Sequence, residues 1–240
     1  MAKNRTGGPG AGTGSGARKF VLAIAALVVV GVVALLAARR SGEQAEAPVL
    51  SVADTEVAAD AAAGTAIGAE DAPAVIIEFA DFLCPHCRSF NAVTGRLLRQ
   101  NYAAQGGKLR WVSYEFPLWP ESLVPALAAQ CAEEQGKYWE MHDLLFARVD
   151  SWRNESSPLA KFVGYARDLG MDGDEFETCV AERRTLPVVM ASRKYGEELG
   201  VTGTPTLFVN GRRLEQTAEA YSYEGLERRI LEAGQEGSAE

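Results

Sequence analysis

The hydrophobic and polar positions of the chain predict short strands separated by amphipathic helices. Residues 74–79 form an apolar run that ends at turn residues, as a buried strand does. Residues 109–116 are rich in aromatic and β-branched side chains and predict a second strand, which is followed by Pro117 and Pro120. Residues 206–209 predict a third strand. Asn210-Gly211 then predicts a tight hairpin turn into residues 212–215.

Helical spacing of apolar residues fills the chain between these strands. We expect a helix to begin within residues 84–87, and further helices between the second and third strands. The apolar positions of the first helix are Phe90, Val93, Leu97 and Leu98. Those of the next helices are, in order, Val124, Leu127, Ala128 and Cys131; then Tyr138, Met141, Leu145 and Val149; then Phe176, Cys179 and Val180, which follow a capping box at Asp172 and Glu175. Residues 186–199 predict a further helix, and Tyr223, Leu226 and Ile230 mark the last one. The order is strand–helix–strand, a block of helices, then hairpin and helix, which indicates an α/β fold.

The N-terminal part of the chain has a different pattern. Residues 20–38 carry no charge and are rich in Val, Leu and Ala. As a helix they would be about 28 Å long, close to the hydrocarbon thickness of a bilayer. We therefore expect an uncleaved transmembrane anchor at 20–38, a flexible glycine-rich cytoplasmic tail at 1–19 and a tether at 39–67. The alternative is a cleaved signal peptide, whose apolar core is shorter, about 7–15 residues.

Composition and charge exclude one class of function. Of the 240 residues, 47% are hydrophobic and 23% are charged, which suits a packed core. Six of the 24 Lys and Arg lie in residues 1–40, where there is no acid. Residues 41–240 contain the other 18 Lys and Arg and all 32 Asp and Glu, so they carry a net charge of −14. Such an acidic domain repels phosphate backbones, and no nucleic-acid partner is expected.

The candidate chemistry lies in Cys84-Pro85-His86-Cys87. Disulfide exchange requires a thiolate, and the free N–H groups at a helix start stabilise that anion. Pro85 begins the helix without an orphaned N–H, and His86 can place a cation or a donor beside the sulfur. We expect Cys84 to be the exposed nucleophile and Cys87 to be the resolving thiol. A stabilised thiolate favours the reduced form, which makes the disulfide oxidising.

Half of a zinc site is the alternative interpretation of this motif. Zinc takes four ligands, and the remaining Cys131, Cys179 and His142 are scattered singly, so neither a metal nor another cofactor is expected. We expect His142 to be a packing residue. Trp119 and Trp152 lie in loop-like segments and could border a substrate groove, although packing is the simpler expectation for both.

The other two cysteines, Cys131 and Cys179, each lie on the apolar face of an expected helix. Free buried cysteines are one possibility. In an oxidising compartment an even leftover pair usually forms a bond, and we expect a structural disulfide.

Three segments together resemble the DsbA-like thiol:disulfide oxidoreductases. Residues 78–87 (EFADFLCPHC) look like the active-site segment of that family. Residues 129–132 together with residues 136–142 resemble the helical insert of its membrane-anchored members, and residues 203–206 (GTPT) resemble its cis-proline loop. The likeness covers roughly residues 66–232. It implies a thioredoxin-like α/β fold with an inserted helical domain. We place this domain at 68–234, with the insert at about 118–200, and expect a disordered tail at 235–240.

The resemblance also implies roles for single residues. Pro205 would be cis and would lie against Cys84, which leaves the Thr204 backbone to pair with a substrate peptide. Glu78 would be a buried carboxylic acid that handles the proton of Cys87. A solvent-facing Glu on an edge strand is the alternative, but the apolar neighbours of Glu78 favour burial.

The expected function is that of an oxidase on the outer side of the cell membrane. Its disulfide would pass to unfolded or reduced secreted proteins, and a membrane redox partner, a quinone-linked oxidase in the family, would restore it. An isomerase or reductase remains an alternative, because Thr204 replaces the Val of the best-known oxidase and occurs in isomerase-type relatives. Against a dimeric isomerase, we expect no long N-terminal dimerisation domain. A redox-inactive module that holds unfolded chains is a further alternative, but such a module would not need two thiols.

Overall fold

A computed structural model of the protein describes residues 64–105 and 107–236. The expected tail at 1–19 and anchor at 20–38 lie outside the described residues, as does the expected tether at 39–67 up to residue 63. Among the helices that the structure does describe, none has both the length and the apolar character needed to span a membrane.

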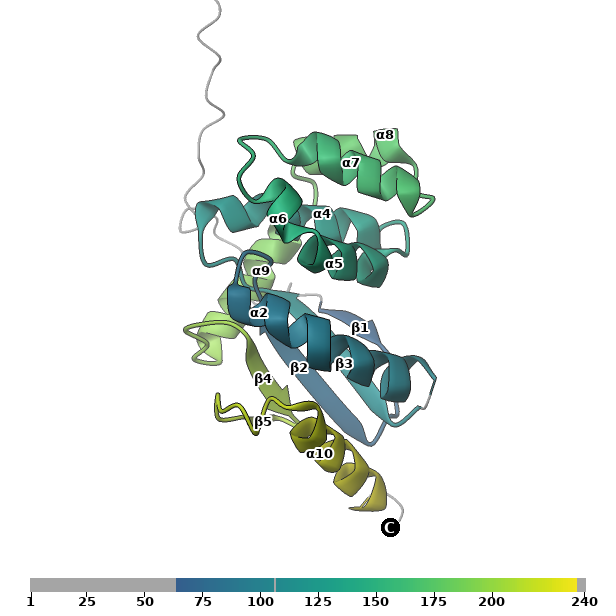
Figure 1. Cartoon of the computed structure of the whole chain (residues 1–240), viewed down its shortest axis with the longest axis vertical. Helices are drawn as coiled ribbons and strands as arrows, with labels where there is room; N and C mark the ends of the chain where they lie inside the picture. The colour runs from purple at the N-terminus through teal and green to yellow at the C-terminus, as the bar shows by residue number, and fades with distance from the viewer. Residues whose placement is uncertain (1–63, 106, 237–240) are drawn as a thin grey trace, which may run out of the picture. The chain divides into compact units, whose positions relative to one another are not determined.

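A mixed five-stranded sheet, in the order β1-β3-β2-β4-β5, lies at the centre of the larger lobe (Figure 1). Its strands are β1 (Thr65–Ile67), β2 (Ala74–Ala80), β3 (Leu109–Glu115), β4 (Thr206–Val209) and β5 (Arg212–Arg213). β2 and β3 run parallel, whereas β4 runs antiparallel to β2. The three strands expected from the sequence are therefore confirmed. The hairpin turn is also confirmed, because Asn210 and Gly211 both have positive φ, 46° and 76°.

The boundaries of the domain need two corrections. β1 lies inside the range 39–67 that we assigned to the tether, and it pairs antiparallel with β3. Gln130 donates a hydrogen bond to Thr65 Oγ1 at 3.3 Å, so this short strand is held by the helical insert as well as by the sheet. At the other end, the last helix continues to Glu236, two residues into the expected tail.

Two helical layers cover the sheet. On one face lies a continuous helical segment made of α2 (Pro85–Phe90), η3 (Asn91–Gly95), α3 (Arg96–Leu98) and η4 (Arg99–Ala104), together with α10 (Tyr223–Glu236). A core of Ile76, Leu98, Trp111, Leu226 and Ile230 joins them to the sheet. On the other face, α9 (Leu186–Glu198) contributes Tyr195 to a second cluster. That cluster contains Phe79, Phe116 and Phe208.

The helix that follows the cysteine motif has a different buried face from the one we expected. Phe90 and Leu98 are buried, but Val93 and Leu97 are 63% and 44% exposed. The helix contains two π-helical stretches, η3 and η4, which alter the angular spacing of its side chains. Polar Asn91 and Arg99 therefore lie inside.

The inserted helices form the smaller lobe, at the top of Figure 1. They are η5 (Pro120–Ser122), α4 (Leu123–Glu133), α5 (Tyr138–Ala147), α6 (Val149–Trp152), α7 (Leu159–Asp168) and α8 (Gly173–Ala181). The expected apolar faces are almost wholly buried here, with Val124 only partly so. α7 was not expected. One half of the capping box expected at the start of α8 is confirmed, because the Asp172 carboxylate accepts hydrogen bonds from the Asp174 and Glu175 amides. The other half does not form, because the Glu175 carboxylate pairs with Arg184.

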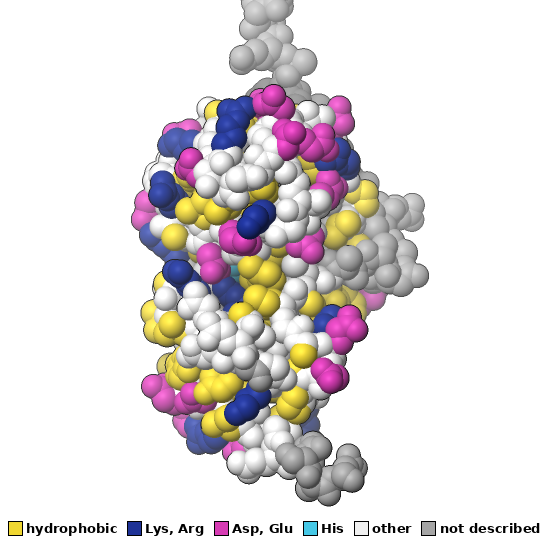
Figure 2. Space-filling view, turned by 90° about the vertical axis from the view of Figure 1, so that its right-hand side faces the viewer, with side chains coloured by type: hydrophobic (Ala, Val, Ile, Leu, Met, Phe, Trp, Pro, Cys, Tyr) yellow, Lys and Arg dark blue, Asp and Glu magenta, His cyan; other side chains and the backbone are white. Residues whose placement is uncertain are grey.

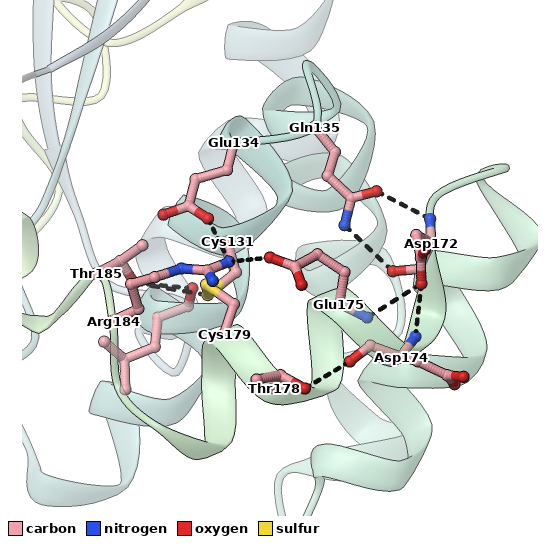
Figure 3. The surroundings of a disulfide bond; sticks show 11 residues. Cys131, Glu134, Gln135, Asp172, Asp174, Glu175, Thr178, Cys179, Arg184 and Thr185 are labelled. Carbon is pink, nitrogen blue, oxygen red and sulfur yellow. Dashed lines mark hydrogen bonds and ion pairs between the residues drawn. A yellow bond between two sulfur atoms is a disulfide. The ribbon is translucent and has the colours of Figure 1, made fainter.

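The insert contains the disulfide expected between Cys131 and Cys179. It joins α4 to α8 with a Cα–Cα distance of 5.9 Å, and each cysteine is 1% exposed. Figure 3 shows that the polar contacts around it join the same two helices: Arg184 pairs with Glu134 at 2.6 Å and with Glu175 at 2.7 Å. The disulfide is thus part of the packing of the insert.

Candidate active site

Local backbone geometry places the cysteine motif at a helix start. Cys84 is the N-cap residue of α2, with extended backbone angles (φ −70°, ψ 120°), and Pro85 begins the helix. Both Cys84 and Cys87 are free thiols. Cys84 is 4% exposed and Cys87 is 0% exposed, so the expectation of an exposed Cys84 is wrong. The reason is the neighbouring loop, since the Sγ of Cys84 donates to the Thr204 carbonyl at 3.3 Å.

The two thiols are electrostatically unequal. The pKa of Cys84 is lowered to about 5, first by the hydrogen bond from the Cys87 thiol and then by Thr204 and the backbone N–H groups of Cys87 and His86, while burial opposes this. The pKa of Cys87 is raised well above 9.0, mainly by burial. We expected the imidazole of His86 to assist Cys84. This side chain is exposed, and the His86 amide is among the groups that lower the pKa of Cys84, so a role for the imidazole stays a prediction.

The loop opposite Cys84 contains a cis peptide bond between Thr204 and Pro205, as the family resemblance implied. The hydroxyl of Thr204 is buried and has no hydrogen-bond partner among the described residues. A thiol can donate to the Thr204 carbonyl, whereas a thiolate can only accept. The unpartnered hydroxyl can therefore join the Cys87 thiol and the helix amides as a donor to Cys84 once the thiol has lost its proton.

A groove of about 590 Å³ runs beside this loop. Its lining includes His86, Phe90, Pro205, Gln216 and Tyr221, and no Lys, Arg, Asp or Glu is found among the described residues that line it. The two tryptophans that could have bordered a groove do not line this one. Trp152 is 2% exposed and donates to the Leu145 carbonyl, whereas Trp119 is 44% exposed.

Glu78, on β2, is buried, which confirms the expectation of burial. Its residue is 1% exposed, and its Oε2 accepts a hydrogen bond from Trp111 Nε1 at 3.1 Å. Oε1 has no hydrogen-bond partner among the described residues. Burial raises the pKa of Glu78 to about 7, although the positive charge of Arg99 opposes the rise. A carboxyl group with this pKa can hold or release a proton near neutrality.

Arg99 is a buried cation whose charge acts on Glu78, and no sequence pattern predicted its burial. Arg99 is 3% exposed, pairs with Asp143 at 2.5 Å and donates to Asn91 Oδ1 at 2.8 Å. Its guanidinium lies 4.6 Å from the ring of Trp139. Only the tertiary contact with the insert explains the burial of an arginine here. A hydrophobicity pattern would place it outside.

The same ion pair borders a cleft between the two lobes. This cleft is about 430 Å³ and is lined by Arg96, Arg99, Trp139 and Asp143, among others. Figure 2 faces the hollowed waist between the lobes, where basic and hydrophobic side chains lie together. His142 is a packing residue, as expected: it is 0% exposed, its Nδ1 lies 3.0 Å from Asp143 Oδ1, and burial lowers its pKa to about 4.

Asp81 is a further site residue that the sequence analysis missed. Its Oδ1 accepts from the Leu83 amide and its Oδ2 from the Leu118 amide, both at 2.7 Å, so it ties the loop before the motif to the loop after β3. The Cys84 amide donates to the Asp81 carbonyl at 3.1 Å. An Asp three residues before a helix N-cap is a sequence signal for such local side-chain to backbone bonding.

No group of three or more His, Cys, Asp or Glu side chains in residues 64–105 and 107–236 is arranged to hold a metal ion. The residues that do converge on Cys84 are Cys87, Thr204 and the amides of the helix start. This arrangement can stabilise a thiolate and exchange it with a second sulfur.

Solved structures with this arrangement of elements include disulfide-exchange proteins. BdbD from Bacillus subtilis has a TM-score of 0.60 with 17% identity, over 72% of this chain and 93% of BdbD. α-DsbA1 from Wolbachia pipientis has a TM-score of 0.62 with 22% identity, over 72% of this chain and 92% of that one. DsbA from Chlamydia trachomatis has a TM-score of 0.61 with 17% identity, over 71% and 91%. At these identities the likeness shows the fold.

Curated relatives carry a similar segment within much longer chains. One is the protein named Na(+)/H(+) antiporter NhaA 3 of Salinispora tropica, 38% identical over 149 residues, which are 61% of this chain and 21% of the antiporter. Another, NhaA of Herminiimonas arsenicoxydans, is 32% identical over 180 residues, 71% of this chain and 25% of that protein. This chain therefore spans about a fifth to a quarter of these relatives.

The family model described as thioredoxin matches residues 60–230, which is well over half of the chain and includes all five strands and the inserted helices. The match contains both halves of the site, the cysteine motif on α2 and the cis-proline loop before β4. The chain belongs to the thioredoxin family, and its structural neighbours are DsbA-family oxidoreductases.

Proposed function

We propose that this protein is an extracytoplasmic thiol:disulfide oxidase that introduces disulfides into secreted proteins through Cys84 and Cys87. The observation that carries the proposal is the inequality of the two thiols. With a pKa of about 5, reduced Cys84 is a thiolate at neutral pH, whereas Cys87 keeps its proton. A stabilised thiolate favours the reduced pair, so the Cys84–Cys87 disulfide readily accepts electrons.

The reaction begins when a substrate thiolate attacks Sγ of Cys84 in the disulfide. The Cys84–Cys87 bond breaks, a substrate–Cys84 mixed disulfide forms, and Cys87 leaves as a thiolate that takes up a proton. Glu78 is the proposed source of this proton, since its pKa is about 7. A second substrate thiolate then attacks the substrate sulfur of the mixed disulfide, and Cys84 leaves as a stabilised thiolate. The substrate has lost two electrons, and the enzyme pair has gained them.

Substrate binding is proposed at the Thr204 backbone and the adjoining groove. Strand-like pairing with backbone groups does not depend on particular side chains of the substrate. The described lining of the groove is free of Lys, Arg, Asp and Glu, so it does not select substrates by charge. Both features suit unfolded or reduced secreted proteins of varied sequence.

The next turnover requires an oxidant. We propose a membrane disulfide-generating partner, of the quinone-linked class, that takes two electrons from reduced Cys84 and Cys87 by a second disulfide exchange. The proposed location is the outer side of the cell membrane, with residues 20–38 as the anchor. The disulfide between Cys131 and Cys179 supports this location, because such bonds persist mainly outside the cytoplasm.

A peptide with two cysteines tests the reaction. The oxidised protein should convert the reduced peptide to its disulfide form with loss of one Cys84–Cys87 bond for each product. Cys87→Ser should accumulate a mixed disulfide on Cys84 when supplied with an activated peptide disulfide, and Cys84→Ser should accumulate none. Peptide oxidation by Cys84→Ser at the wild-type rate would sink the assignment.

A reporter enzyme that is active only outside the cytoplasm, fused after residue 240, tests the location. The proposal expects an active reporter. A silent reporter, beside an active fusion to an inward-facing control, would contradict it.

An isomerase or reductase is the second candidate, and Thr204 is the residue that favours it. A scrambled substrate with several wrong disulfides tests whether the protein mainly rearranges disulfides or mainly forms them. Efficient rearrangement by the reduced protein, together with slow oxidation of the peptide above, would favour the isomerase.

A further inference from the structure

Two side chains from the segment after β5 hold the cis-proline loop. Gln216 Nε2 donates to the Pro205 carbonyl at 2.9 Å and to Thr206 Oγ1 at 3.2 Å. The Tyr221 hydroxyl donates to the same Pro205 carbonyl at 3.3 Å and accepts from the Leu207 amide at 3.0 Å. The carbonyl that follows the cis bond is therefore held by two donors.

Tyr221 also reaches the helix that carries the cysteines. Its ring lies 5.8 Å from the ring of Phe90, three residues after Cys87 on α2. One side chain thus joins the loop to the active-site helix. Cys84 Sγ contacts the carbonyl of Thr204, the residue before Pro205. This contact holds the thiol against the loop.

Neither side chain acts on the thiol itself. The causes that lower the pKa of Cys84 are Cys87, Thr204 and helix amides, and they include neither Gln216 nor Tyr221. Both residues do line the groove beside Thr204 and Pro205. Their contacts fix the backbone with which a peptide would pair, and a fixed partner loses less conformational freedom when it binds.

We propose that Gln216 and Tyr221 are positioning residues for the substrate, which orient the Thr204–Pro205 backbone for pairing with a peptide. The inference rests on the proposed thiol–disulfide exchange and deepens it. It separates two steps: the sulfur chemistry depends on Cys84, Cys87 and the helix start, whereas peptide recognition depends on the two side chains that hold the loop.

The test compares a substrate that can pair with the loop with one that cannot. Oxidation of a two-cysteine peptide is measured beside reduction of the enzyme disulfide by dithiothreitol, for wild type, Gln216→Ala and Tyr221→Phe. Gln235→Ala and Tyr223→Phe are matched controls on α10: Gln235 is exposed, and the Tyr223 hydroxyl accepts a hydrogen bond from Asn101. The pKa of Cys84 is followed by thiolate absorbance in each variant.

Each loop variant removes two hydrogen bonds, and the loss of even one corresponds to roughly a fivefold effect. Each loop variant should therefore lower kcat/KM for the peptide by at least about fivefold, mainly through KM. The dithiothreitol rate and the pKa of Cys84 should stay at wild-type values, and the controls should match wild type. Unchanged peptide kinetics, or equal losses with peptide and dithiothreitol, would overturn the inference. Gln216→Ala removes an exposed side chain, so the test holds even where Tyr221→Phe fails to fold. A wild-type protein without peptide oxidation would instead overturn the proposed function.

Discussion

The low pKa of Cys84 predicts how the stability of the reduced protein depends on pH. Folding lowers this pKa from 9.0 to about 5, so the folded thiol releases its proton more readily than the unfolded one. The resulting stabilisation is fully present above pH 9 and is lost as the pH falls through about 5. Between these limits it grows by about 1.4 kcal/mol per pH unit, which gives about 3 kcal/mol at pH 7. The oxidised protein has no thiolate and lacks this contribution.

The comparison of oxidised and reduced protein isolates this effect. The raised pKa of Cys87 changes protonation only above pH 9, outside the range of the experiment. Glu78 titrates in both redox forms, so its contribution cancels to first order when the two are subtracted. The free energy of unfolding is measured by urea titration of both forms between about pH 4 and pH 8. Its value for the reduced form minus its value for the oxidised form should rise with pH above about 5.

Two variants sharpen this prediction. Thr204→Val removes the side-chain donor but keeps the shape, so it should raise the pKa of Cys84 and move the onset of the rise to higher pH. Cys84→Ser has no thiol to titrate at this position and should lose the extra slope of the reduced protein. A difference between the redox forms that stays constant from pH 4 to pH 8 would refute the reasoning.

Two further predictions concern parts of the fold away from Cys84. Arg99→Met should lower the free energy of unfolding by about 3 kcal/mol, because it leaves Asp143 without its buried partner. The more exposed Arg96→Met should change it little, and equal effects of the two in urea unfolding would argue against the buried pair. The double change Cys131→Ala, Cys179→Ala should cost about 4 kcal/mol in the chain-entropy model and leave peptide oxidation intact at permissive temperature. Lost activity in a folded double variant would mean that this pair carries electrons.

The sequence was informative wherever a local pattern decides the structure. Apolar runs indicated β2, β3 and β4, and Asn210-Gly211 indicated the hairpin because both residues accept positive φ. The helix start at Cys84 followed from Pro85 and the apolar spacing after it. The cis bond at Pro205 followed from the family resemblance alone, since propensity favours the trans form.

Tertiary contacts decided what the sequence did not show. Arg99 lies inside because Asp143, from the insert 44 residues later, neutralises it. Glu115, at the end of β3, is buried because Tyr138 and Gln130 of the insert donate to it at 2.8 and 2.9 Å, and burial raises its pKa to about 7. β1 has only three residues, too few for a periodic pattern, and is held by its pairing with β3.

The redox state of Cys84 and Cys87 inside the cell tests the central claim most directly. Cells are quenched in acid, free thiols are labelled with a reagent that adds mass, and the labelled and unlabelled forms are separated. Cys131→Ala, Cys179→Ala serves as background, so that only the active-site pair is counted. An oxidase with a membrane partner that restores its disulfide should be mostly oxidised at steady state. A pair found mostly reduced would contradict the oxidase and point to an isomerase or reductase.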